Sequence, residues 1–97
     1  MKKNNDEKIK EKEIAIIAGA SKAMDEFIFG EMPDEEKILS KVLKEIEVGK
    51  HLQSYVLAGA NFALKKKIRK VKITEKEIMQ SLSNEIPLMV LEIKENK

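Results

Sequence analysis

A repeat of about 40 residues is the feature of this sequence that most limits its possible folds. When the chain is aligned with itself at an offset of 40, residues 10–47 pair with residues 50–87 without a gap. Ten of these 38 pairs are identical, and most other apolar positions match in kind. The strongest match pairs residues 16–24 with residues 56–64. Self-similarity at a fixed period predicts two copies of one structural unit, although two amphipathic helices of biased composition also produce part of such a match.

The first unit, about residues 8–48, has the apolar spacing of two consecutive helices. Intervals of three and four predict a helix over residues 7–29, and Gly30 with Pro33 supplies its end. Pro33 and the acids after it favour the start of a second helix, which we expect to end before Gly49. The predicted core-facing residues are Ile14, Ile17, Ser21, Met24, Ile28, Ile38, Leu39, Val42, Leu43 and Ile46.

The second unit, about residues 49–87, repeats this pattern. Thr74 and Glu77 have the spacing of a capping box, which predicts that a helix begins there. The helix before it is expected to run to about Val71. The predicted core-facing residues of this unit are Leu57, Ala60, Leu64, Ile68, Val71, Ile78, Met79 and Leu82.

The C-terminal segment, residues 88–97, begins with four apolar residues that periodicity alone does not assign to helix or strand. We expect a fifth helix capped by Asn84, with Pro87 in its first turn; an extended segment is the alternative. The sequence thus predicts one all-α domain over residues 1–97, in which two tandem helical hairpins form a compact four-helix domain with a C-terminal fifth helix or extended segment.

Composition excludes several classes of function. The chain has no cysteine, so disulfides, zinc–thiolate sites and cysteine nucleophiles are absent, and one histidine, His51, cannot build a metal cage alone. No catalytic constellation or phosphate-binding loop is recognisable. We therefore expect no enzyme, no cofactor and no metal. No apolar run approaches the roughly 18 to 20 residues of a membrane span, and no signal peptide is recognisable, so we expect a cytoplasmic protein without membrane contact.

The Ala-Gly-Ala segments place a glycine inside the first predicted helix of each unit. Such a glycine costs about 1 kcal/mol relative to alanine, so we expect a close contact that offsets the cost. Small residues at intervals of four let helix backbones approach each other. We predict that these two helices cross; a notch for a partner's helix and a small-ligand cavity are the alternatives. The residues of the predicted crossing are Ala15, Gly19, Ala23, Gly59 and Ala63.

A basic segment, residues 65–72, lies at the C-terminal end of the first helix of the second unit. It has six positive charges in eight residues, at the end of the helix where the macrodipole favours cations. A solvated helix end is the first interpretation, and contact with phosphates or with an acidic protein is the alternative. Phosphate contacts here would be poorly sequence-specific and salt-dependent. The candidate contact residues are Lys65, Lys66, Lys67, Arg69, Lys70 and Lys72.

Acids and aromatic residues gather at the matching end of the first unit. Phe27 and Phe29 flank Ile28 in the sequence. If Ile28 faces the core, the two rings cannot both face it as well. Residues 1–48 have a net charge of −3 and residues 49–97 a net charge of +5. This asymmetry favours an interface, with packing of the rings under the C-terminal segment as the alternative. The predicted interface residues are Phe27, Phe29, Tyr55 and Phe62.

These features together favour a non-enzymatic protein–protein interaction module that forms a homodimer or binds another protein. The alternative function is a nucleic-acid-associated accessory protein that binds phosphates non-specifically through residues 65–72.

Overall fold

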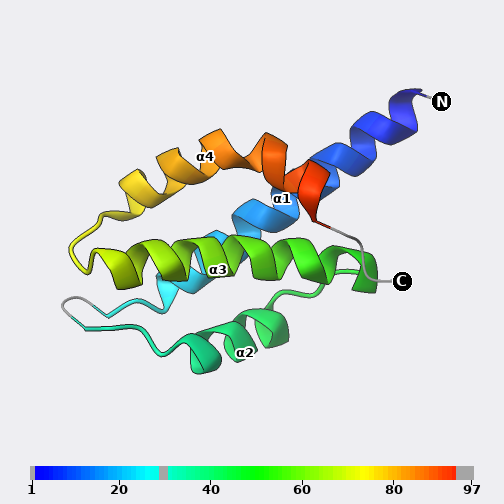
Figure 1. The fold of residues 1–97 in the computed structure, drawn as a ribbon. Coiled ribbons are helices and arrows are strands. Elements are labelled where there is room, and N and C mark those ends of the chain that lie inside the picture. Colours follow the sequence, from blue (N-terminus) through cyan, green and yellow to red (C-terminus); the bar gives the residue numbers. More distant parts are fainter. Residues whose placement is uncertain (1, 29–30, 94–97) are drawn as a thin grey trace.

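The part of the chain that the structure describes folds into four α-helices and one short 3-10 helix (Figure 1). The computed structural model describes residues 2–28 and 31–93, with side chains from residue 8 onward. The described elements are α1 (Lys2–Asp25), α2 (Glu35–Glu45), η1 (Lys50–Leu52), α3 (Gln53–Arg69) and α4 (Glu75–Glu92). The described residues contain no strand. The predicted all-α architecture is therefore confirmed.

Helices α1 and α3 lie at the centre and run in the same general direction, with α2 and α4 on opposite sides of them (Figure 1). Each outer helix packs against both central helices, and α2 does not contact α4 in the described part of the chain. The N-terminal part of α1 extends beyond the other helices, which gives the molecule a length of 48 Å (Figure 1).

Two glycines allow the close approach of α1 and α3. A Cβ atom at Gly19 would overlap the carbonyl group of Val56, and a Cβ atom at Gly59 would overlap the carbonyl group of Ile16. The two contacts are reciprocal, because each residue of one contact has its counterpart 40 positions away in the other. Ala15, Ala23 and Ala63 of the predicted crossing are buried beside them. The cost of a glycine within each helix is thus offset by helix-to-helix packing.

The buried face of α1 differs from the predicted one. Ile14 and Ile17 were expected in the core, but their side chains are 64% and 40% exposed. Ser21 and Ile28 are also exposed, and so is Leu43 on α2. The residues of α1 that face the core are instead small residues and their neighbours in the sequence. Only small side chains fit where the backbones of two helices come close together. The buried residues of α1 are Ala15, Ile16, Gly19, Ala20, Ala23 and Met24.

Side chains at the N-termini of the two outer helices define where they begin. The Asp34 carboxylate accepts a hydrogen bond from the backbone N–H of Lys37 at 3.2 Å, at the start of α2. Thr74 and Glu77 form the predicted capping box of α4, with each side chain bonded to the backbone of the other. Both caps satisfy N–H groups that the first turn of a helix leaves unpaired.

Several predicted boundaries are wrong. Helix α1 ends at Asp25 rather than at residue 29, whereas α2 ends at Glu45 and thus before Gly49, as predicted. No separate fifth helix or extended segment exists up to residue 93, because α4 continues through Pro87 to Glu92. Apolar packing of the last turns of α4 on the core holds the helix together across the proline. The predicted tail beyond residue 93 lies outside the described residues.

Candidate functional site

An open groove of about 400 Å³ lies between α3 and α4. Its α3 wall has the helical spacing 62, 65, 66 and 69, and its α4 wall has the spacing 81, 84 and 85, so each wall is one face of a helix. The lining residues are Phe62, Lys65, Lys66, Arg69, Ser81, Asn84 and Glu85. We call this feature the α3/α4 groove.

The α3/α4 groove is positively charged. Three cations face one carboxylate, that of Glu85. Lys65, Lys66 and Arg69 form no ion pair with another described residue, and the ammonium group of Lys66 lies 5.3 Å from the ring centroid of Phe62. Ser81 and Asn84 add a hydroxyl and an amide group that can donate hydrogen bonds. The groove is thus suited to an anion.

The rest of the basic segment does not share this environment. Lys67 is only 7% exposed, and its ammonium group lies 5.5 Å from the ring centroid of Phe27. Lys70 forms an ion pair with Glu77 at 3.8 Å. Lys72 is exposed at the turn between α3 and α4. The predicted six-residue patch is therefore divided into a buried lysine, a paired lysine, an exposed lysine at the turn and the three groove cations.

The three described residues of the predicted aromatic interface are buried or half-buried in the single chain. Tyr55 is 1% exposed, and its hydroxyl group donates a hydrogen bond to the carbonyl oxygen of Ile93 at 3.1 Å. Phe27 and Phe62 are half-buried and pack against the core. Phe29 lies outside the described residues. Tyr55 therefore belongs to the core of the single chain.

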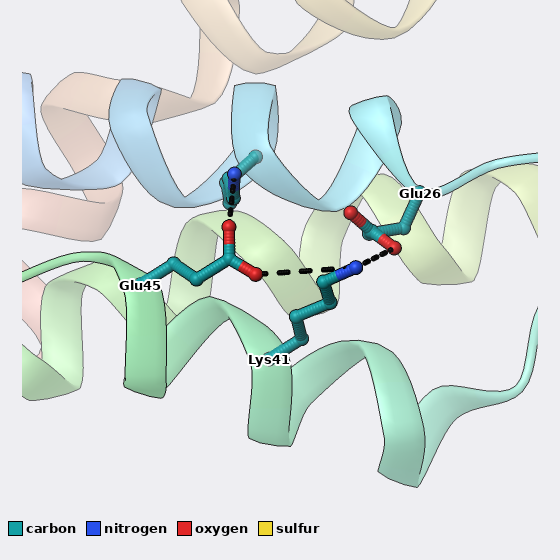
Figure 2. Close-up of polar contacts among 4 residues, drawn as sticks. Glu26, Lys41 and Glu45 are labelled. Carbon is teal, nitrogen blue, oxygen red and sulfur yellow. Dashed lines mark hydrogen bonds and ion pairs between the residues drawn. The ribbon is translucent and has the colours of Figure 1, made fainter.

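An ion-pair network bridges α1 and α2 (Figure 2). The Lys41 ammonium group lies 3.1 Å from a carboxylate oxygen of Glu26 and 3.9 Å from one of Glu45. Lys22 binds the other oxygen of Glu45. The hydrogen bond from Lys22 lowers the pKa of Glu45 below its ordinary value, and the same bond raises the pKa of Lys22. The sequence alone does not reveal this network, because the network depends on which faces of the two helices meet.

Large apolar side chains remain exposed outside the groove. Ile14 and Ile17 lie one helical turn apart on α1. Ile9 is 43% exposed although it lies two turns before the buried Ile16, on the same side of the helix. The other exposed large hydrophobic residues are Ile28, Met32, Leu43, Leu88 and Leu91.

Comparison with known proteins adds no family. No family model matches the chain, and no significant similarity was found to curated proteins or to solved structures. None of the described helices combines the length and hydrophobicity needed to cross a membrane. Among the described residues, no three histidine or acidic side chains are grouped closely enough to hold a metal ion.

Proposed function

We propose that this protein is a non-enzymatic helical interaction module that forms a homodimer through α1. The observation that carries the proposal is the pair Ile14 and Ile17, which lie one turn apart and are 64% and 40% exposed. Burying both side chains against the same residues of a second copy removes apolar surface from water, which is the main driving force of association.

The extent of exposed surface supports self-association. The chain exposes 6870 Å², whereas a compact monomer of 11.1 kDa exposes about 5,700 Å². The excess comes in part from the end of α1 that extends beyond the bundle (Figure 1). The excess is about 1,200 Å², which is more than the roughly 800 Å² that a standard interface covers on each partner.

Light scattering coupled to size exclusion, at two protein concentrations and at low and high salt, tests this proposal. We expect a dimer that persists at high salt, because the contact is apolar. The variant Ile14→Gln/Ile17→Gln is expected to be monomeric. Leu43→Gln is the matched control, since Leu43 is 41% exposed but lies on α2, and this variant is expected to remain dimeric. A wild-type monomer under every condition contradicts the proposal.

The two hairpins are proposed to be copies of one duplicated unit. The reciprocal contacts Gly19–Val56 and Gly59–Ile16 support this, since they are related by the same offset of 40 as the sequence match. Burial follows the same offset in the outer helices. The buried pairs are Ile38 with Ile78 and Val42 with Leu82.

The alternative function, non-specific binding of nucleic-acid phosphates through residues 65–72, has weaker support. Burial of Lys67 and the ion pair of Lys70 with Glu77 leave fewer cations for a long polyanion. The cations that remain together are those of the α3/α4 groove.

A further inference from the structure

The two hairpins differ in how their helices are bridged. Between α1 and α2, the acid Glu26, directly after the end of α1, meets the base Lys41 on the outer helix (Figure 2). Lys22 on α1 meets Glu45 on α2. The residues 40 positions later all line the α3/α4 groove. The corresponding pairs are Glu26 with Lys66, Lys41 with Ser81, Lys22 with Phe62, and Glu45 with Glu85.

This exchange leaves the second hairpin with three cations on one wall of the groove and a single carboxylate, that of Glu85, on the other. Where the first hairpin has a Glu–Lys bridge, the second has Lys66 facing a neutral serine, Ser81. Arg69 and Lys65 add two further charges on the same wall. In the first hairpin, carboxylates of the chain neutralise the lysines. In the second hairpin, a negatively charged ligand in the groove would neutralise the cations.

We propose that the α3/α4 groove binds the phosphate group of a phosphate ester, an inference that goes beyond self-association and rests in part on the proposed duplication. The Arg69 guanidinium can bind two phosphate oxygens at once, and the ammonium groups of Lys65 and Lys66 supply further charge-assisted hydrogen bonds. The Ser81 hydroxyl and the Asn84 amide donate from the other wall.

The volume of the groove indicates the kind of ligand. About 400 Å³ is far more than one phosphate group fills and lies in the range of small-molecule sites. The ligand is therefore a phosphate ester whose organic part lies along Phe62, such as a phosphorylated side chain or a small metabolite. These two sources present the same group to the same residues.

The surroundings of the groove favour one phosphate group over a nucleic-acid strand. Glu77 lines a neighbouring hollow together with Ser81 and Asn84, and Glu85 lies within the groove itself. A strand that leaves the groove along α4 meets these carboxylates. One face of the Phe62 ring is already covered by Lys66, which removes a platform on which a base would stack.

A titration followed by amide chemical shifts of the full chain tests the proposal at constant ionic strength. The probes are inorganic phosphate, O-phosphoserine, a phosphoserine peptide and a 12-residue oligothymidylate. We expect saturable shifts at Arg69, Ser81 and Asn84 with inorganic phosphate, O-phosphoserine and the phosphoserine peptide, and none with sodium chloride. Tighter binding of the peptide than of O-phosphoserine identifies a phosphoprotein as the source, and equal binding identifies a metabolite. Absence of saturable shifts overturns the proposal, as does binding of the oligothymidylate at least ten times tighter than of either ester.

The variant Lys66→Glu/Ser81→Lys tests whether binding depends on the unpaired charge of Lys66. It rebuilds in the second hairpin the Glu–Lys bridge of the first, so it is expected to keep the fold while weakening O-phosphoserine binding at least tenfold. Arg69→Gln, at an exposed position, is expected to weaken binding without a change in melting temperature and serves if the double variant fails to fold. Lys50→Gln, outside the groove, should bind as the wild type does. Unchanged affinity in Arg69→Gln overturns the proposal.

Dimerisation through α1 and phosphate-ester binding in the groove can be tested independently of each other. The variant Ile14→Gln/Ile17→Gln is expected to lose dimerisation and to retain phosphate-ester binding, because neither isoleucine lines the groove. Loss of phosphate binding in this folded variant overturns the assignment of the site to the groove of a single chain.

Discussion

The ammonium group of Lys67 lies 5.5 Å from the centroid of the Phe27 ring. These two residues occupy positions 40 apart in the sequence, after the crossing of α1 and α3. Lys67 is nearly buried, and its ammonium group lies over the half-buried ring. The contact joins the segments at the C-terminal ends of the two central helices.

Substitutions of Lys67 separate its packing role from its charge. We expect Lys67→Met to lower the free energy of unfolding by less than about 1 kcal/mol, since it keeps the apolar stem and loses the cation–π contact. Lys67→Glu is expected to cost more than about 2 kcal/mol, because it buries a carboxylate against the face of an aromatic ring. Urea denaturation followed by circular dichroism measures both. Lys65→Glu, at an exposed position, is the control, and an equal cost there would contradict this role for Lys67.

The glycines of the crossing should not tolerate alanine. Gly19→Ala and Gly59→Ala place a methyl group against a backbone carbonyl, so we expect each to lower the free energy of unfolding by about 1 to 3 kcal/mol or more, despite the better helix propensity of alanine. Gly49→Ala is the control, because its Cβ would meet only the imidazole of His51, which can move. Chemical denaturation of the three variants checks this. Stabilisation by Gly59→Ala would falsify the close approach of α1 and α3.

Pro87 is expected to weaken the helix that contains it. It is exposed and lies inside α4, where its ring removes one backbone hydrogen bond and crowds the preceding turn. We therefore expect Pro87→Ala to raise the free energy of unfolding by about 1 to 3 kcal/mol. Ser83→Ala, also exposed on α4, isolates helix propensity and is expected to change stability by less than about 0.5 kcal/mol. A destabilised Pro87→Ala variant would contradict this expectation and show that the proline helps α4 to pack against the core.

Acid should destabilise the protein through Glu45 and Glu77. Lys22 lowers the pKa of Glu45, and hydrogen bonds from Thr74 lower the pKa of Glu77. Both pKa values lie below the ordinary 4.5 in the folded chain, so their stabilisation is present above that pH and is lost as the pH falls through the folded-state values. We expect Glu45→Gln/Glu77→Gln to flatten the dependence of stability on pH between about pH 5 and pH 2. Glutamine still fits a capping box, so equal slopes in variant and wild type contradict this origin.

High pH is expected to destabilise the protein through Lys22, the partner of Glu45 in the same ion pair. Glu45 raises the pKa of Lys22 above its ordinary 10.5. The stabilisation from Lys22 is therefore complete below that value and is lost as the pH rises through the higher pKa of the folded chain. Lys22→Gln should reduce the loss of stability measured by urea denaturation above about pH 10. An unchanged loss in this variant would assign the alkaline effect to other groups.

The sequence by itself determined the helical class, the approximate order of the helices, the start of α4 and the importance of Gly19 and Gly59. These features are local: periodicity and the Thr74–Glu77 spacing act within a few residues, and a glycine inside a helix carries its cost wherever it stands. Only the tertiary structure decided that Ile14 faces solvent, that Tyr55 is buried, that Lys67 covers Phe27 and that Lys66 lines a groove. Each of these depends on which faces of two helices meet, and backbone proximity at the small residues, rather than the most hydrophobic stripe, sets that choice.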